Sequence, residues 1–319
     1  MQPVLSPRLS LVVPVYGNEG SIDALLDALR GIDAAMGGAF EAVLVVDGSP
    51  DRSFALLHER LPGAGFHSNL LALSRNFGAF AAIRAGLEHA RGEVIAVMAA
   101  DLQEPPDLAL EFQKRLAAGE GDVAFGVRES RQDPALSQLA SGLFWRVYRR
   151  WVMPDIPKGG VDIFALTSAF RDRLVALRES NSSLLAQLFW LGGRRVFVPY
   201  RRRAREHGTS AWTLRKKMRY LSDSVFAFTD LPVRLLMWSG LAGLVIAAVV
   251  GVVTAVARFA GMVDVPGYAM TMLAILFFGA LNALGLGVVG SYAWRAFENT
   301  KQRPLAVVQS SQTFGPGAP

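Results

Sequence analysis

The first 130 residues alternate between short apolar runs and segments with apolar side chains at helical spacing. The apolar runs are typical of buried strands, and they lie at residues 9–16, 41–47, 70–73, 93–98 and 122–127. Between them, apolar positions three and four residues apart predict helices from Ser21 onward and at residues 53–60, 80–90 and 105–118. Strands that alternate with single helices predict an α/β fold with a doubly wound, mostly parallel sheet.

Two long apolar runs follow in the C-terminal part of the chain. Residues 235–257 contain no charged side chain. At about 1.5 Å per residue this run forms a helix of roughly 34 Å, which is enough to cross a hydrocarbon core of about 30 Å. A second uncharged run covers residues 265–294. We therefore expect two C-terminal transmembrane helices.

These patterns divide the chain into four expected parts. They are a cytoplasmic α/β domain at residues 1–210, a juxtamembrane amphipathic region at 211–233, a two-helix transmembrane hairpin at 234–295 and a cytoplasmic tail at 296–319. Within the tail, residues 309–319 have the composition of a disordered segment. Two basic segments with apolar side chains at helical spacing, residues 136–151 and 214–228, fit helices in the membrane interface. Packing on the sheet is the alternative for both.

Positive charges lie beside both apolar runs. The flanking basic residues are Lys216, Lys217, Arg219, Arg234, Arg295, Lys301 and Arg303. The connector holds only Arg258 and Asp264, so the positive-inside rule places both termini in the cytoplasm. Residues 1–10 lack the apolar core of a signal peptide, which fits that orientation. A net charge of +6 alone would also suit nucleic acid, but the basic residues concentrate beside the apolar runs, so we expect contact with anionic lipid head groups and no nucleic acid partner.

Polar or glycine-rich motifs follow four of the predicted strands. In chain order they read VPVYGNE (13–19), VDGSPD (46–51), SRNFG (74–78) and ADLQEPP (100–106). Because the carboxyl ends of parallel strands meet at one edge of a sheet, the four motifs describe a single ligand crevice. The oxygens of Asp101 and Gln103 suit a hard cation such as Mg²⁺ that also binds a diphosphate.

In this order and spacing, the motifs resemble those of family 2 glycosyltransferases of the GT-A fold. The likeness is closest to the polyprenyl-phosphate branch, which includes dolichol-phosphate mannose synthases and bactoprenol glucosyltransferases. It extends to GGVD (159–162), to REHGTSAW (205–212) and to the paired C-terminal spans. The resemblance implies transfer of a sugar from a UDP- or GDP-linked donor to a polyprenyl phosphate at the cytoplasmic face. We expect inversion, because no nucleophile for a covalent intermediate is evident.

Nucleotide contacts are expected at Pro14, Tyr16, Glu19, Asp47 and Asp101. The Tyr16 ring can stack on a base, and the Glu19 carboxylate can accept hydrogen bonds from the edge of that base. Asp47 ends a strand at the position from which a carboxylate reaches ribose hydroxyls. A turn-forming role within Asp-Gly-Ser-Pro is the alternative for Asp47.

The resemblance assigns Mg²⁺ or Mn²⁺ to Asp101 and Gln103. Related enzymes carry an Asp-x-Asp-x-Gln pattern, and in this chain Ala99 stands in place of the first aspartate. A site with fewer anionic ligands binds free metal more weakly, so we expect the ion to enter together with the nucleotide.

A polyprenyl phosphate is already anionic near neutral pH, so the reaction depends more on cations than on a base. The resemblance places the acceptor phosphate at Arg128, Arg131, Arg205 and Ser210. The catalytic candidates are Asp101, Asp162 and Arg128. Orienting a sugar hydroxyl, assisting deprotonation and capping a loop all remain open for Asp162. In the run Arg201, Arg202, Arg203 and Arg205, at least two members fit a solvated or lipid-facing role.

Two other functions remain open. A hydroxyl acceptor would make the chain a glycolipid or polysaccharide synthase, although it lacks the QxxRW signature of processive synthases. Alternatively, Ala99 marks a decayed site in a non-catalytic membrane scaffold. Small residues of the second apolar run, such as Gly279, Gly285 and Gly290, fit a homo-oligomer or packing between the two spans of one chain.

Overall fold

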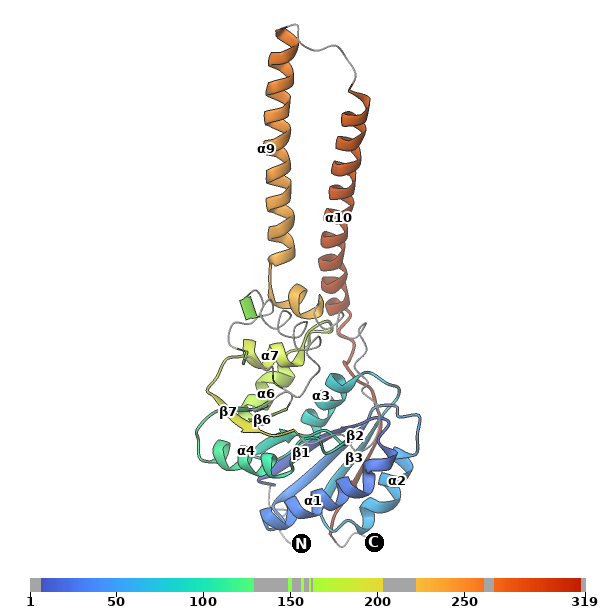
Figure 1. Ribbon diagram of the computed structural model, residues 1–319. Coiled ribbons are helices and arrows are strands. Elements are labelled where there is room, and N and C mark those ends of the chain that lie inside the picture. Colours follow the sequence, from blue (N-terminus) through green and yellow to red (C-terminus); the bar gives the residue numbers. More distant parts are fainter. Residues whose placement is uncertain are drawn as a thin grey trace. The chain divides into compact units, whose positions relative to one another are not determined.

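The computed structural model describes residues 7–128, 149–150, 156–157, 161, 163–202, 222–260 and 267–316. The chain splits into two compact units (Figure 1). The sheet unit comprises Met1–Glu179, Ser183–Lys216 and Arg303–Pro319, and the helical unit comprises Ser180–Ser182 and Lys217–Gln302.

Among the described residues, the sheet unit contains one eight-stranded sheet with the order β7-β5-β6-β4-β1-β2-β3-β8. The strands are β1 (Leu9–Val15), β2 (Phe40–Val46), β3 (His67–Leu73), β4 (Val94–Val97), β5 (Val123–Arg128), β6 (Phe164–Thr167), β7 (Arg195–Tyr200) and β8 (Val308–Phe314). β6 and β8 run antiparallel to their neighbours, and the other pairings are parallel. The expected mostly parallel α/β sheet is therefore confirmed.

Helices cover both faces of this sheet (Figure 1). They are α1 (Ile22–Met36), α2 (Ser53–Arg60), α3 (Ala79–His89), α4 (Asp107–Ala117), α6 (Ser168–Ala176) and α7 (Leu184–Trp190), with short 3₁₀ turns η1 (Glu19–Ser21) and η2 (Leu61–Gly63). Successive strand side chains point to opposite faces. Leu11 and Val13 therefore join the core under α1 and α4, whereas Val12 meets α3. A Cβ on Gly86 of α3 would lie 2.3 Å from Val12, so this helix can approach the sheet only with glycine there.

The elements expected over the first 130 residues are all present, with boundaries that shift by at most three residues. β6, β7, α6 and α7 were not predicted. β6 has only four residues, and β7 alternates buried and exposed positions instead of forming an apolar run.

The C-terminal segment is part of the sheet, so the expectation that residues 309–319 are disordered is wrong for residues 309–314. This segment forms β8, which pairs antiparallel with β3 from Ser68↔Phe314 to Leu73↔Val308. Half-buried and exposed residues alternate strictly along β8. Its polar composition resembles that of a disordered tail, but a strand at a sheet edge needs only this period of two.

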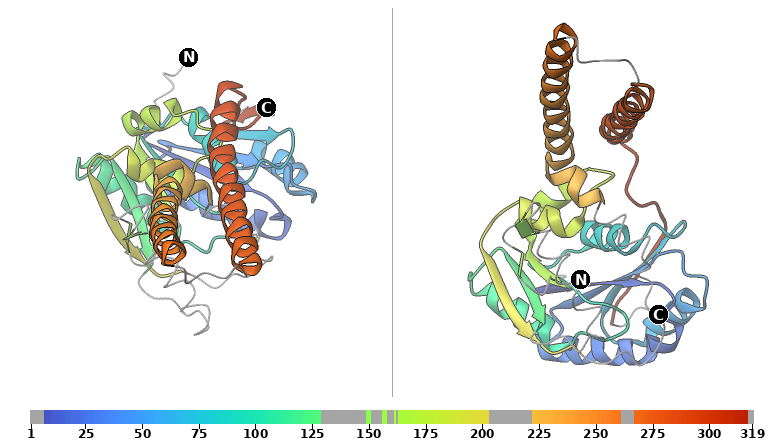
Figure 2. Two further views of the ribbon diagram at one scale, coloured as in Figure 1. Left: turned by 90° about the horizontal axis from the view of Figure 1, so that it is seen from above. Right: turned by 45° about the horizontal axis from the view of Figure 1, so that its top comes forward.

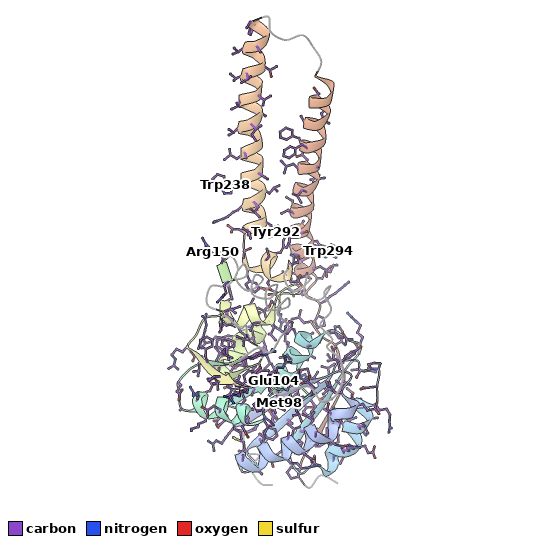
Figure 3. The ribbon with its side chains drawn as sticks, in the orientation of Figure 1. Met98, Glu104, Arg150, Trp238, Tyr292 and Trp294 are labelled. Atoms are coloured by element: carbon purple, nitrogen blue, oxygen red, sulfur yellow. The ribbon has the colours of Figure 1, made fainter. Side chains whose placement is uncertain are left out.

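The helical unit contains α9 (Leu231–Phe259) and α10 (Tyr268–Thr300), which Figure 2 shows as two unbroken helices. Both are long and apolar enough to cross a membrane, over Leu231–Thr254 and Phe277–Thr300. Trp238 of α9 and Trp294 of α10 are exposed on them (Figure 3). The two expected basic helices lie mostly outside the described residues. Only residues 149–150 and 222–228 of these segments are described, and both stretches are helical.

Contacts within the helical unit join its two long helices. Gly285 of α10 faces Leu236, and a Cβ at this glycine would lie 3.4 Å from that side chain. Gly243 of α9 faces Phe278, and a Cβ there would lie 3.2 Å from the ring. The small residues at these positions thus serve packing between the helices of one chain. A homo-oligomer remains a prediction.

At the amino-terminal end of the sheet, the buried carboxylate of Glu41 joins three segments. Glu41 is 2% exposed. It accepts hydrogen bonds from Ser10 Oγ at 2.6 Å and from Arg91 Nη2 at 3.0 Å, and also from the Arg91 backbone N–H. The Gly92 N–H in turn donates to Ser10 Oγ at 2.7 Å. A buried charge is tolerated because its hydrogen-bond partners replace water. The Glu41 carboxylate and its donors therefore stabilise one another.

We predict that Glu41→Ala lowers the free energy of unfolding by about 3 kcal/mol, because it leaves Ser10 and Arg91 without their shared acceptor. Thermal unfolding of the detergent-solubilised protein measures this. The control is Asp27→Ala, which breaks the exposed Asp27–Arg30 pair and is expected to change stability little. Equal effects of the two substitutions would contradict the prediction.

Candidate active site

Six strands of the sheet run in one direction, so their carboxyl ends lie at one edge. They are β1, β2, β3, β4, β5 and β7. The structure therefore brings Tyr16, Asp47, Asp101 and Arg128 to the same edge from four different strands. Pro14 lies within β1. Arg131, Asp162, Arg205 and Ser210 lie outside the described residues, so their roles stay predictions.

Asp51 connects the loop after β1 to the loop after β2. Its carboxylate accepts hydrogen bonds from the Glu19 N–H at 3.0 Å, from Ser49 Oγ at 2.6 Å and from the Ser53 N–H at 3.1 Å. Burial alone would raise the pKa of Asp51, but hydrogen bonds from Ser49, Ser53 and the Glu19 backbone outweigh it and hold the pKa below its ordinary value of 3.8. Sequence reasoning gave Asp51 no role, although it closes the VDGSPD motif.

Glu19 also takes part in this connection between the loops. Its Oε2 accepts a hydrogen bond from the Arg52 N–H at 3.1 Å, and the Gly17 N–H donates to Ser49 Oγ at 2.8 Å. Tyr16, by contrast, is 45% exposed at the edge, where a ring is available for stacking. The contact of Glu19 with a base remains a prediction.

Asp47 links the loop after β2 to the loop after β3. Its carboxylate accepts from the Phe77 N–H at 2.7 Å and from the Gly78 N–H at 2.8 Å, and the residue is 2% exposed. Next to it, Gly48 has a φ of 57°, and a Cβ there would lie 2.4 Å from the Arg75 carbonyl carbon. These contacts tie Asp47 to the loop after β3, which differs from the local turn within Asp-Gly-Ser-Pro that was its alternative. Each carboxylate oxygen retains a second lone pair, so the ribose contact also stays a prediction.

The loop after β3 carries a stacked cation. The Arg75 guanidinium lies 4.1 Å from the centre of the Phe77 ring. At the start of this loop, the Ser74 N–H donates to the Val307 carbonyl at 3.0 Å, one residue before β8. The C-terminal segment therefore contacts the site edge directly.

The turn after β4 contains both Asp101 and Gln103, two residues apart. Leu102 between them has a φ of 52°, a left-handed conformation that is uncommon for a side chain of this size. The Gln103 N–H donates to Asp101 Oδ1 at 3.4 Å. Met98 and Glu104, labelled in Figure 3, flank the turn and are each 2% exposed. Backbone strain of this kind concentrates at functional sites.

The donor set of this turn fits a hard cation only together with a phosphorylated ligand. Among the residues that the structure describes, no three His, Cys, Asp or Glu side chains cluster as a metal site. Asp101 and Gln103 offer one carboxylate and one amide, and Mg²⁺ accepts such a pair when phosphates and water complete its octahedron.

Arginines from neighbouring strands face the same edge. Arg128 is the last residue of β5, and Arg202 lies two residues beyond β7, the parallel neighbour of β5. Arg202 Nη2 donates a hydrogen bond to Gln103 Oε1. Sequence reasoning did not single out Arg202, although the basic run that follows the alternating β7 was a usable signal. An acidic turn opposite arginines, at the edge of a parallel sheet, is typical of enzymes that act on phosphate esters.

Comparison with known proteins identifies the family. The family model described as "Glycosyl transferase family 2" matches residues 10–165. An undecaprenyl-phosphate 4-deoxy-4-formamido-L-arabinose transferase of Pseudomonas aeruginosa is 32% identical over 326 residues, covering 100% of this chain and 94% of that protein. An uncharacterized glycosyltransferase of Synechocystis sp. is 30% identical over 306 residues, covering 94% of each chain. The chain belongs to glycosyl transferase family 2 and is a glycosyltransferase.

The resemblance seen in the motifs is thereby confirmed, and an enzyme is favoured over a scaffold. Among solved structures, the mannosyltransferase PcManGT from Pyrobaculum calidifontis, in complex with GDP-Man and Mn²⁺, is 20% identical with a TM-score of 0.46. The match covers 92% of this chain and 86% of that one. Similarity at this level identifies neither the donor nor the metal of this chain.

We predict that Asp51→Asn lowers the melting temperature at pH 7 by about 3 °C, because the amide can no longer accept from all three donors. The pKa of Asp51 is lowered in the folded protein. Its contribution is therefore complete above about pH 3.8 and is lost as the pH falls through the lower folded pKa. Melting curves recorded at decreasing pH are expected to show a difference between wild type and variant that shrinks below about pH 3.8. The exposed residue Glu59 on α2 gives the control, Glu59→Gln, and a difference that stays constant or grows as the pH falls through this range would contradict the assignment.

Proposed function

We propose that this glycosyltransferase moves one sugar from a UDP- or GDP-linked donor to a polyprenyl phosphate, with inversion at the anomeric carbon. The observation that carries this proposal is the turn with Asp101 and Gln103 opposite the arginines at the ends of β5 and β7. That arrangement suits two phosphorylated ligands, a donor diphosphate and an acceptor phosphate. Relatives named as undecaprenyl-phosphate transferases match the whole chain, which supports the acceptor class.

The reaction is a single displacement. An oxygen of the acceptor phosphate attacks the anomeric carbon, the bond from that carbon to the donor diphosphate breaks, and the nucleoside diphosphate leaves with the electron pair. The configuration inverts because attack and departure occur on opposite faces. The attacking oxygen is already anionic, so the chain needs mainly to orient it and to offset its charge. We assign that role to Arg128, Arg131, Arg205 and Ser210, and we assign Asp162 to the orientation of a sugar hydroxyl.

The donor is proposed to bind along the ends of β1, β2 and β4. Tyr16 stacks on the base, and Pro14, Glu19 and Asp47 shape the pocket around the base and the ribose. Asp101 and Gln103 would hold Mg²⁺ or Mn²⁺ against the diphosphate. When bound, that ion supplies positive charge to the departing diphosphate.

The acceptor lipid implies a membrane, and the helical unit offers the means to reach it. We propose that α9 and α10 cross the bilayer as a hairpin. The basic residues before α9 and after α10 then lie on the cytoplasmic side, and the sheet unit lies there too. Within the last two turns of α10, Arg295 donates hydrogen bonds to Asp223 Oδ1 at 2.8 Å and to the carbonyl of Asn181 at 3.0 Å.

We predict that purified protein releases nucleoside diphosphate only with one nucleotide sugar, a divalent cation and a polyprenyl phosphate together. Asp101→Ala is expected to lower the rate by about 100-fold or more, because it removes the carboxylate of the metal turn. The control is Asp107→Ala, an exposed acid at the start of α4 that should keep activity. A product with the anomeric configuration of the donor, or release that needs a sugar hydroxyl acceptor instead of the lipid phosphate, would refute the proposal.

We also predict that Ala99→Asp changes turnover by less than about threefold while it tightens Mn²⁺ binding. The reason is that the site relies on phosphate oxygens, not on a second carboxylate, to complete the metal coordination. Steady-state rates over a range of Mn²⁺ concentrations separate the two effects. A large rise in turnover at saturating Mn²⁺ would mean that the natural site is impaired.

A further inference from the structure

The side chain of Gln103 already has a cationic partner in this chain. Arg202 Nη2 donates a hydrogen bond to Gln103 Oε1, across 99 positions of sequence. Gln103 is only 8% exposed, so packing holds its amide in place. The bonded oxygen is the atom that would ligate the divalent cation under the proposed function.

When a guanidinium and a divalent cation bind the same amide oxygen, each weakens the binding of the other. Both are positive, and on a shared oxygen they lie within a few ångströms, well inside the distance at which salt screens charges. The Asp101 carboxylate offsets part of this repulsion, and Ala99 on the same turn offsets none. In the absence of nucleotide, Arg202 therefore competes with a metal ion for Gln103.

A diphosphate reverses this balance. It brings several negative charges, and the planar fork of an arginine matches phosphate oxygens with two parallel hydrogen bonds. Arg202 then has a better partner than a neutral amide, and Gln103 Oε1 becomes available to the cation. We propose that Arg202 is a positioning residue that holds Gln103 until the diphosphate arrives, so that cation and nucleotide bind as a coupled pair. This inference rests on the proposed function and names the residue that sets its order of binding.

Mn²⁺ titration of the full-length protein in detergent tests this inference, with free Mn²⁺ measured by electron paramagnetic resonance. Without nucleotide, Arg202→Ala is expected to bind Mn²⁺ about tenfold more tightly than the wild type. Arg202→Lys keeps the charge and is expected to stay within about twofold of the wild type. Arg201→Ala is the matched control, because it removes an equal charge one residue away, and it is expected to gain about twofold or less.

Two further measurements isolate the role of Gln103 and of the nucleotide. In a Gln103→Ala background, Arg202→Ala is expected to give no gain in Mn²⁺ affinity. Adding UDP or GDP is expected to tighten Mn²⁺ binding to the wild type more than to Arg202→Ala. The inference is overturned if Arg202→Ala matches Arg201→Ala, or if its gain survives the loss of Gln103. If no variant binds nucleotide with Mn²⁺, the proposed function itself fails, and the inference fails with it.

Discussion

The common direction of six strands is the constraint on which the site depends. A parallel sheet places all the loops that follow its strands along one edge, whatever their sequence separation. Asp47 and Asp101 come from strands with β1 between them, and Arg202 follows them by about 100 residues or more. No local segment of this chain could bring these groups together alone. The antiparallel β6 and β8 leave this arrangement intact, because they place their amino ends, not their carboxyl ends, at this edge.

The acidic residues of the edge differ in what their oxygens contact. Asp51 and Asp47 use their oxygens on backbone N–H groups of neighbouring loops, which fixes the loops after β1, β2 and β3 relative to one another. Asp101 lies in a strained turn whose amide neighbour meets an arginine.

The sequence predicted the elements whose pattern is local, and it did not predict those that depend on partners far away in the chain. The strands β1 to β5 are apolar runs, and the polar motifs that follow β1 to β4 predicted a shared edge. β8 was missed because its polar residues are stabilised by β3, more than 200 positions away. Arg202 was one of four similar arginines in the sequence, and the pairing of β7 with β5 places it at the same edge as Gln103. The partners of Asp47 were equally hidden, since a carboxylate in a turn motif has the same sequence whether it binds amides or a ligand.

The position of β8 in the chain also links the completion of the sheet to the order of protein synthesis. β3 is complete at Leu73, and its outer edge is covered only when Phe314 emerges, 241 residues later. At roughly 5–20 residues per second the ribosome needs roughly 10–50 s for this stretch. Through that interval an unpaired strand edge is open to pairing with other chains. Both α9 and α10 are synthesised before β8 covers this edge. The sheet unit is therefore completed only after the two apolar helices have been made.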